Sequence, residues 1–382
     1  MSSARAETKL PIQEGVPLKP YTTFKIGGPA RYFAEISTPE EVRAAGTFAR
    51  KHGTAIFVLG GGSNIVVSDR GFDGLVLHPA RRGIDGGTRD GEKISVRAEA
   101  AETWDDVVGF AVERGWWGIE NLSHIPGQAG AALVQNIGAY GQQLSDVFEA
   151  AEVADLATGA VRTFGAEDCR LGYRSSVFNT SVRGRYFIFN LALRLSERER
   201  PNIEYRDLSA WFAKHGAAPP TQSEIRAAVI QIRDRKFPFP REERGGNAGS
   251  FFKNLTLTAA EYEKLEGRFR SEFGASALGR LREVRKLGEP PDSARIPTAF
   301  LIEVCGLKGR QVGGAQVNER QPLVLLNQGG ATADDVMSLA REVRRTLYAR
   351  LGVTVSLEPE PVGFSDAELR AYLSLGCPPL PG

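Results

Sequence analysis

Glycine-rich turns separate short apolar runs in the N-terminal part of this chain and limit the folds that it can adopt. Glycine makes up 43 of the 382 residues, about 11% against an average of about 7%. The apolar runs between the turns are too short for helices, which predicts strands at residues 55–59, 65–67, 75–77 and 94–96. Because glycine lets the backbone approach a ligand closely, these turns are also candidate binding segments.

Capping signals predict helices that alternate with the strands. Thr38, Pro39 and Glu41 combine a capping box with a proline at the first helical position, which predicts a helix over 38–52 that ends at Gly53. The longest apolar run, 186–193, is expected as a central strand of a sheet. Further helices are predicted at 104–114, 223–236, 258–272 and 332–351, and further strands at 151–153, 323–326 and 353–357.

Charge and cysteine content argue against several classes of protein. Lysine and arginine number 48 and aspartate and glutamate 46, so the formal net charge is 48 − 46 = +2, which gives no reason to expect nucleic acid or a membrane as a partner. No apolar run reaches the roughly 18 residues of a membrane span, and no secretory signal is present. The three cysteines and the histidines form no disulfide or metal motif. We expect a cytoplasmic protein without a metal, with Cys169 and Cys305 buried and Cys377 exposed.

Two glycine-rich segments are candidates for binding a ligand through the backbone. The first, Gly60-Gly61-Gly62-Ser63-Asn64, stands between two predicted strands, so it is neither a dinucleotide-binding G-x-G-x-x-G nor a P-loop. Its N–H groups can form an anion nest to which Ser63 and Asn64 add donors, and a simple tight turn is the alternative. The second, 125–141, is rich in small residues that suit a backbone wrapped around a planar or phosphorylated ligand, or else a close-packed connection.

Three further segments carry side chains suited to catalysis. Ser250 lies in a glycine-rich turn before two aromatic residues that could anchor the loop. A serine hydroxyl can protonate only a strong base such as a carbanion, and a structural turn serine is the alternative. Arg174 lies among apolar neighbours and needs an anion or carbonyl partner, with a structural ion pair as the alternative. Glu358 and Glu360 end a predicted strand, where solvated carboxylates are the alternative.

Taken in order, these segments resemble the UDP-N-acetylenolpyruvoylglucosamine reductase family of bacterial cell-wall synthesis. The resemblance extends from about residue 18 to residue 360, and seven motifs in register are specific. Leu133 and Pro361 depart from the family pattern, and this proline could shift the carboxylate of Glu360. The motifs are residues 21–28, 60–64, 125–127, 135–141, 173–174, 246–254 and 357–360.

The resemblance implies an α+β protein with two main domains. The first is an FAD-binding domain of the p-cresol methylhydroxylase type, built from two α/β subdomains, and the second is a C-terminal α+β domain for the UDP-sugar substrate. An insertion that covers the substrate with a tyrosine marks the longer subtype of the family. The expected divisions are a flexible N-terminus at 1–16, the FAD-binding domain at 17–198, the insertion at 199–222, the substrate domain at 223–364 and a tail at 365–382.

The resemblance also implies the cofactors and the roles of individual residues. Hydride passes from NADPH through noncovalent FAD to UDP-N-acetylglucosamine enolpyruvate, which becomes UDP-N-acetylmuramate, a peptidoglycan precursor. The catalytic residues implied are Arg174, Ser250 and Glu360, with Ser250 as the proton donor. The substrate-binding residues implied are Tyr173, Tyr205, Lys236 and Asn254. The FAD-binding residues implied are Gly60, Gly61, Gly62, Ser63, Asn64, Ile125, Pro126, Gly127, Gly130, Gln135, Asn136, Gly138, Ala139, Tyr140 and Gly141.

Two other functions are compatible with these residues. One is another FAD-dependent oxidoreductase of the same fold, such as an oxidase or dehydrogenase of a small alcohol, against which the intact Tyr205, Lys236, Asn254 and Ser250 argue. The other is a noncatalytic module that binds a UDP-sugar or a flavin. For the reductase we expect a monomer.

Overall fold

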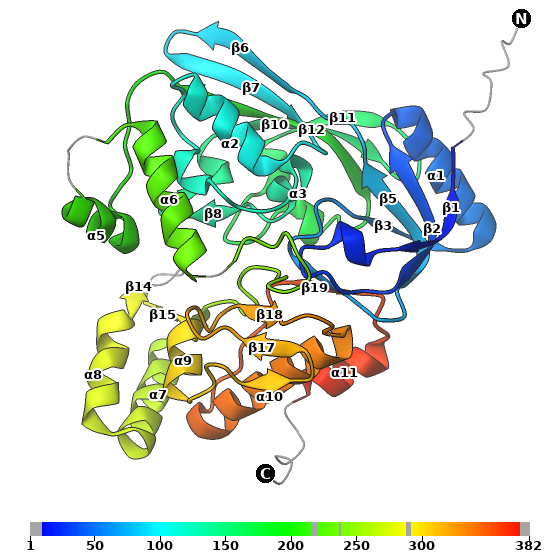
Figure 1. Ribbon diagram of the computed structural model, residues 1–382. Coiled ribbons are helices and arrows are strands. Elements are labelled where there is room, and N and C mark those ends of the chain that lie inside the picture. The colour runs from blue at the N-terminus through cyan, green and yellow to red at the C-terminus, as the bar shows by residue number, and fades with distance from the viewer. Residues whose placement is uncertain (1–9, 216–219, 237, 288–291, 375–382) are drawn as a thin grey trace, which may run out of the picture. The chain divides into compact units, whose positions relative to one another are not determined.

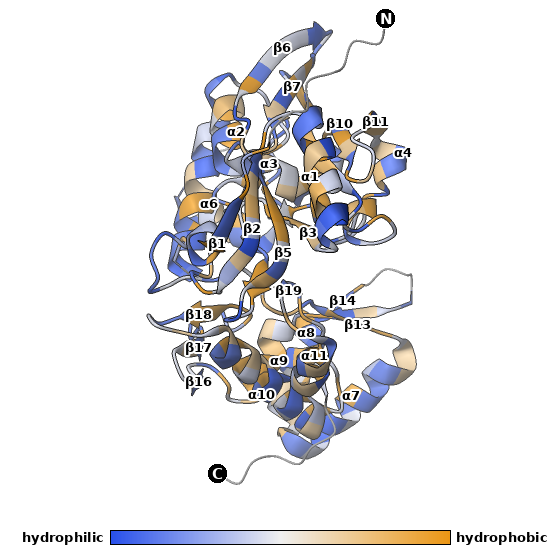
Figure 2. Ribbon diagram, turned by 90° about the vertical axis from the view of Figure 1, so that its right-hand side faces the viewer, coloured by the Kyte–Doolittle hydropathy of each residue, from blue (hydrophilic) through white to orange (hydrophobic). Residues whose placement is uncertain are grey.

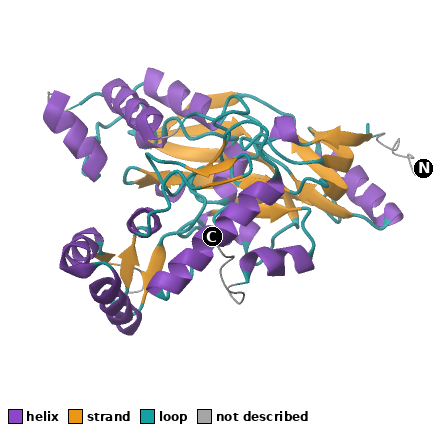
Figure 3. Cartoon of the chain, turned by 60° about the horizontal axis from the view of Figure 1, so that its bottom comes forward, coloured by secondary structure: helices purple, strands orange, loops and turns teal. Residues whose placement is uncertain are grey.

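Helices and strands are interspersed throughout the computed structural model, which describes residues 10–215, 220–236, 238–287 and 292–374 (Figure 1). The chain divides into two units with separate cores. Both units contain helices and strands (Figure 3), which confirms the predicted α+β class. Among the described residues, the first unit comprises 10–17, 29–62, 72–215 and 220–235, and the second comprises 18–28, 63–71, 236, 238–287 and 292–374.

A four-stranded sheet with one helix packed against it forms one part of the first unit. Its strands run in the order β1 (Gln13–Pro17), β2 (Pro29–Ile36), β5 (Phe72–Pro79) and β3 (Ala55–Val58). Helix α1 (Pro39–His52) buries Val42 and Ala45 against this sheet, and Figure 2 shows how hydrophobic β5 is. The predicted capping box of Thr38 and Glu41 and the end at Gly53 are confirmed.

Strand β1 corrects the expectation that residues 1–16 are flexible. Gln13, Glu14 and Val16 pair with β2 in an antiparallel ladder, so regular structure begins before residue 17. The polar composition was misleading because an edge strand with exposed side chains is held by backbone hydrogen bonds, which composition does not reveal. Residues 1–9 lie outside the described residues.

A five-stranded antiparallel sheet forms the other part of the first unit. Its order is β11 (Val161–Gly165), β10 (Phe148–Asp155), β12 (Tyr186–Ser196), β7 (Lys93–Glu99) and β6 (Ile84–Asp90). The central position of β12 confirms the prediction for 186–193. Helices α2 (Trp104–Glu113) and α3 (Ala129–Val134) pack against this sheet. The two sheets correspond to the two subdomains predicted for the FAD-binding domain.

Helix α6 (Gln222–Lys236) lies in the first unit up to residue 235, although the sequence placed it at the start of the C-terminal domain. It packs against Trp117 and Tyr140, and so does Leu208 of α5 (Arg206–His215). Apolar periodicity shows that a helix face is buried, but it does not show which partner buries it. The predicted apolar face itself is confirmed by the burial of Ile225, Val229 and Ile232.

Small sheets surround the long helix α10 (Ala333–Leu351) in the second unit. One sheet contains β13 (Leu255–Leu257), β15 (Ala294–Ile296) and β14 (Lys286–Leu287), and another contains β16 (Gln311–Val312), β17 (Ala315–Val317) and β18 (Leu325–Asn327). A parallel pair joins β4 (Ile65–Val67) to β19 (Glu360–Val362). The described helices also include α7 (Ala259–Glu272), α8 (Gly274–Val284), α9 (Thr298–Val304) and α11 (Asp366–Leu373).

The strand predicted at 353–357 is wrong. Val353 and Val355 are buried and alternate with exposed residues, but the carbonyl of Val355 accepts a hydrogen bond from Nε of Arg344 at 2.9 Å. Only Leu357 forms an isolated bridge, with Phe252. Alternating burial identified an extended chain, but a strand also needs a neighbouring strand to accept its hydrogen bonds.

Both cysteines in the described part of the chain, Cys169 and Cys305, are buried, as predicted. Burial raises the pKa of the Cys169 thiol to about 12 and that of the Cys305 thiol to about 11, which disfavours the reactive thiolate. Cys377 lies outside the described residues. Among the helices of the described ranges, none combines the length and apolar character needed to cross a lipid bilayer.

We expect the Thr332→Ala substitution to destabilise the second unit by about 1 kcal/mol. The Thr332 hydroxyl accepts a hydrogen bond from the Asp335 N–H at 3.0 Å, and this bond caps the N-terminus of α10. Urea-induced unfolding measures the loss. Thr332→Ser keeps the hydroxyl and should retain most of the stability; an equal loss in both variants would contradict the capping role.

Candidate functional site

The two glycine-rich segments of the first unit lie against each other. A Cβ atom added to Gly61 would lie 2.7 Å from Cα of Gly127 and 2.8 Å from the backbone nitrogen of Gln128. Only a residue without a side chain permits this approach of two backbones. The close-packed alternative for 125–141 is therefore realised at Gly127, and the contact holds the two candidate segments together.

The glycine loop at 60–64 is flanked by two strands, as predicted, but the strands belong to different sheets. Strand β3 lies in the four-stranded sheet, whereas β4 pairs with β19. Gly62 has a φ of 57°, a left-handed conformation that favours glycine. Gly60 to Gly62 belong to the first unit, and Ser63 and Asn64 to the second, so the residues predicted as one anion nest are divided between the units.

Residues 129–134 form helix α3, which the sequence did not predict. A Cβ on Gly130 would lie 2.8 Å from Cβ of Ala100, so this glycine permits close packing of the helix. Leu133, where the family pattern has proline, is fully buried in the core. Beside the helix, Oε1 of Gln128 is buried without a hydrogen-bond partner and lies 3.5 Å from where a Cβ on Gly60 would be. This acceptor can bind a donor on a ligand at the glycine loop.

Tyr173 and Arg174 form a tight turn next to the predicted segment 135–141. Arg174 has a φ of 52°, uncommon for a bulky residue and typical of constrained functional positions. Its Nη2 donates to the carbonyl of Gly138 at 3.0 Å, so a carbonyl is one of the partners that its apolar setting was predicted to require. Asn136 is buried, and its Nδ2 donates to the carbonyl of Gly172, the residue before the turn, at 2.9 Å. The structure thus brings these two predicted segments together.

Tyr140 and Tyr205, predicted for FAD and for substrate respectively, also lie side by side. Their ring centroids are 5.4 Å apart and the rings meet edge to face at 78°. Burial raises the pKa of Tyr140 to about 12, although Arg233 of α6 hydrogen-bonds to it and acts in the opposite direction. Nε of Arg233 also donates to the carbonyl of His124 at 2.9 Å. Arg233, which the sequence analysis missed, therefore contacts both the residue before the segment 125–141 and Tyr140 near its end.

A buried carboxyl that the sequence analysis also missed supports the same loop. Glu120 is fully buried, and it accepts hydrogen bonds from Nε2 of Gln142 at 2.6 Å and from the Gly118 N–H at 2.8 Å. Burial raises the pKa of Glu120 above its ordinary value. The available signal was an acidic residue within the apolar run 116–122, since such a residue is rarely buried without a specific partner.

In the second unit, Ser250 is held between two other segments of the chain. It forms an isolated bridge with Val324, and Phe252, two residues later, forms another with Leu357. Phe251 and Phe252 are fully buried in the hydrophobic core of this unit, as expected for residues that anchor the loop. The backbone at Ser250 is therefore fixed by packing on both sides.

Glu360 lies close to this segment in the same unit. The N–H of Glu358 donates to the carbonyl of Phe251 at 3.0 Å, and the N–H of Glu360 donates to the carbonyl of Asn64 at 2.9 Å. Nδ2 of Asn64 donates in turn to the carbonyl of Glu358 at 3.1 Å. The segment 250–252 runs antiparallel to the segment 357–360. Ser250 and Glu360 therefore lie at the same end of these two paired segments.

Pro361 leaves the strand that begins at Glu360 intact. The β4–β19 pairing uses the N–H of Glu360 and the N–H of Ser68, which donates to the carbonyl of Val362 at 2.8 Å. Proline lacks an N–H, but this ladder needs none at position 361. The family departure is therefore accommodated without disrupting the backbone at Glu360.

The remaining residues predicted for the substrate lie in the second unit. Oδ1 of Asn254 accepts from the Thr298 N–H at 3.2 Å, at the start of α9, and the carbonyl of Lys236 accepts from Nδ2 of Asn318 at 3.0 Å. Both residues are half-buried. The approach of Arg174, in the first unit, to Ser250 and Glu360 stays a prediction.

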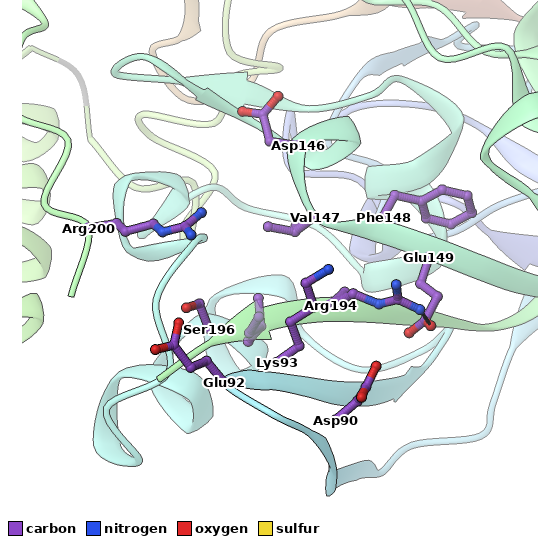
Figure 4. Close-up of a pocket in the computed structure, with 11 residues that line it drawn as sticks. Asp90, Glu92, Lys93, Asp146, Val147, Phe148, Glu149, Arg194, Ser196 and Arg200 are labelled. Carbon is purple, nitrogen blue, oxygen red and sulfur yellow. Dashed lines mark hydrogen bonds and ion pairs between the residues drawn. The ribbon is translucent and has the colours of Figure 1, made fainter. Parts of the chain in front are cut away.

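A cavity of about 700 Å³ on the five-stranded sheet contains none of the predicted site residues (Figure 4). Its lining includes the charged residues Lys93, Asp146, Glu149, Arg194 and Arg200. Arg194 forms an ion pair with Glu149, whose carboxylate also accepts from Ser95 at 3.0 Å. Arg194 and Glu149 thus neutralise each other within the sheet, and none of the residues predicted for the site lines this cavity.

We expect Gly61→Ala to destabilise the first unit by about 1–3 kcal/mol, because the added methyl group overlaps the backbone at Gly127. Thermal unfolding and the affinity for added flavin measure the effect. Gly109→Ala is the matched control, since its Cβ would lie 3.7 Å from the nearest atom, in Arg226. Equal behaviour of the two variants would show that the backbone contact is unimportant.

The raised pKa of Glu120 predicts a pH-dependent contribution to stability. Below pH 4.5, its ordinary pKa, the carboxyl is protonated in both states. As the pH rises, the unfolded chain loses this proton first, so the stabilisation is lost as the pH passes through the raised pKa. Glutamine does not titrate, so the stability advantage of wild type over Glu120→Gln should shrink as the pH rises above 4.5. A difference in unfolding free energy that is constant over this range would contradict the expectation.

Comparison with known protein families assigns both parts of the chain. Residues 30–165 match the sequence profile of an FAD binding domain. Residues 240–362 match that of the UDP-N-acetylenolpyruvoylglucosamine reductase C-terminal domain. The two profiles fall in the regions where the sequence predicted the flavin and substrate domains.

Individual relatives are similar over almost the whole chain. The UDP-N-acetylenolpyruvoylglucosamine reductase of Burkholderia multivorans is 39% identical over 93% of this chain and 98% of its own length. That of Pseudomonas aeruginosa is 39% identical over 92% of this chain and 98% of its own. The crystal structure of the enzyme of that name from Thermus caldophilus matches with a TM-score of 0.60 and 25% identity, covering 93% of this chain and 99% of that one.

Proposed function

The chain belongs to the UDP-N-acetylenolpyruvoylglucosamine reductase family, and we propose that it reduces UDP-N-acetylglucosamine enolpyruvate to UDP-N-acetylmuramate with NADPH and bound FAD. The observation that supports this most is the 39% identity to a relative of that name over 93% of the chain. The serine, arginine and glutamate of the family's catalytic pattern are all present, as Ser250, Arg174 and Glu360.

The residues at the glycine loop fit an FAD group. The backbone N–H groups of Gly60 to Gly62 can bind the anionic pyrophosphate, and the buried Oε1 of Gln128 offers an acceptor beside them. The segment at 135–141, held by Arg174 and Arg233, can line the ring system. When bound there, FAD would supply the hydride transfer from NADPH to the terminal carbon of the enolpyruvyl group.

Arg174 stabilises the negative charge that develops as the hydride is added. This charge forms on the carbon next to the reduced one and spreads into the substrate carboxylate, where a guanidinium in a fixed position is effective. The constrained backbone of Arg174 and its bond to Gly138 fix its direction before the substrate binds.

Ser250 completes the reduction by donating its hydroxyl proton to the carbanionic carbon. The substrate thus gains one hydride and one proton, and the serine recovers its proton from water. A hydroxyl is a weak acid, so only a strongly basic partner of this kind can take its proton. The packing of Phe251 and Phe252 holds the serine at one position. We further propose that the reaction takes place in the cytoplasm, where NADPH and UDP-sugars occur, and that the enzyme acts as a monomer.

We expect Ser250→Ala to slow reoxidation of the reduced flavin by the enolpyruvyl substrate at least ~10²-fold, the usual contribution of a positioned proton donor. Reduction of the flavin by NADPH should not change, because that half-reaction needs no proton from serine. Rapid-mixing absorbance at the flavin band measures the two half-reactions separately.

Ser271→Ala is the control for this variant. Its hydroxyl bonds only to carbonyls of its own helix, at 3.2 and 3.1 Å, so both half-reactions should keep their wild-type rates. Unchanged reoxidation in Ser250→Ala would exclude the proton-donor role. Purified wild type that is colourless and takes up no FAD would instead favour a noncatalytic binding module, and rapid flavin reduction by a small alcohol but not by NADPH would favour another oxidoreductase of the same fold.

A further inference from the structure

The side chain of Asn121 joins two segments of the first unit that are far apart in sequence. It is fully buried, and its Nδ2 donates to the carbonyl of Tyr140 at 2.7 Å and to the carbonyl of Asn202 at 2.8 Å. Its backbone N–H donates to Oε1 of Gln142 at 2.9 Å. One amide group therefore holds the loop at 138–142 and the start of the insertion at 199–222.

The chemistry of the site requires an amide nitrogen in this position. The two carbonyls are acceptors, and Nδ2 has two hydrogens, one for each. Oδ1 of Asn121 is buried without a partner, so turning the amide over would place an oxygen against two oxygens and satisfy nothing. Aspartate or leucine at this position would leave both carbonyls without their donor.

Further contacts link the same two segments. Nδ2 of Asn202 donates to the carbonyl of Gly141 at 3.0 Å, and a Cβ on Gly141 would lie 3.3 Å from that amide. Three residues later, Tyr205 packs edge to face on Tyr140. Gln142, the last residue of the loop, donates from its Nε2 to the buried carboxyl group of Glu120, which anchors the loop to the core. The loop and the insertion thus share one rigid support.

We propose that Asn121 is a positioning residue that fixes the start of the insertion, residues 202–212, to the loop at 138–142, so that Tyr205 is held ready to cover the substrate. This inference rests on the proposed function, in which the loop lines the flavin and Tyr205 covers the UDP-sugar. Without Asn121, the substrate itself must order the insertion as it binds, at a cost in affinity. The chemical step, which depends on other residues, changes little.

Hydrogen exchange of the purified protein tests the link without any substrate. In Asn121→Leu we expect the amides of 202–212 to exchange at least about tenfold faster than in wild type, with those of α10 unchanged. Asn190→Leu is the matched control: Asn190 is a buried asparagine of the same unit whose Nδ2 has no hydrogen-bond partner, so it should not affect 202–212. Unchanged exchange at 202–212 in Asn121→Leu would overturn the proposal.

Steady-state kinetics test the consequence for the reaction. In Asn121→Leu we expect the KM for the enolpyruvyl substrate to rise about tenfold and kcat to change less than about threefold, a pattern that indicates lost binding and not lost chemistry. Flavin reduction by NADPH should keep its wild-type rate. A fall in kcat with an unchanged KM would contradict the positioning role.

A second variant keeps the proposal testable if Asn121→Leu does not fold. Asn202→Ala removes the bond to Gly141 but leaves the Asn202 carbonyl on Asn121, so we expect a smaller rise in both the exchange at 202–212 and the KM. No change in either would count against the shared support. Wild type that binds FAD but does not reduce the enolpyruvyl substrate would refute the proposed function alone, because the exchange data still decide whether Asn121 joins the two segments.

Discussion

The contact between the backbones at Gly61 and Gly127 is the constraint on which the candidate site of the first unit depends. Two segments meet there with no room for a Cβ atom on Gly61. From this contact the chain continues through α3 into the segment at 135–141, which receives the Arg174 guanidinium at Gly138. The backbone contact at Gly61 and the hydrogen bond of Arg174 to Gly138 together connect the glycine loop, α3 and a candidate catalytic arginine.

Hydrogen bonds of buried polar groups then fix the conformation of the loop at 138–142. Glu120 and Asn121 lie in the core, where each hydrogen bond replaces one that water would otherwise supply. Both act on the loop at 138–142, one through Gln142 and the other through the Tyr140 carbonyl, and Arg233 reaches the Tyr140 side chain from α6. Because a buried group without a partner is costly, breaking these hydrogen bonds is unfavourable, and they restrict the conformations of the loop.

Local features of the fold were predictable from sequence, and features that depend on partners were not. The capping box at Thr38 follows from a few neighbouring residues, and it is confirmed. The strand predicted at 353–357 failed because its hydrogen bonds go to a side chain and to isolated partners. The ordered strand at Gln13–Pro17 was missed because a polar edge strand depends on its neighbour. The placement of α6 was wrong because a helix face does not identify what it packs against.

The order of the motifs was enough to identify the family and to predict which residues carry its chemistry, since both rest on the chain itself. The tertiary structure decided where those residues stand: Ser63 and Asn64 in a different unit from the glycines before them, Ser250 beside the segment that leads to Glu360, and Arg174 against Gly138. It also disclosed Glu120, Asn121 and Arg233, which no motif singled out. The physical reason is that a hydrogen bond between distant segments leaves no local pattern, and only the folded chain brings its donor and acceptor together.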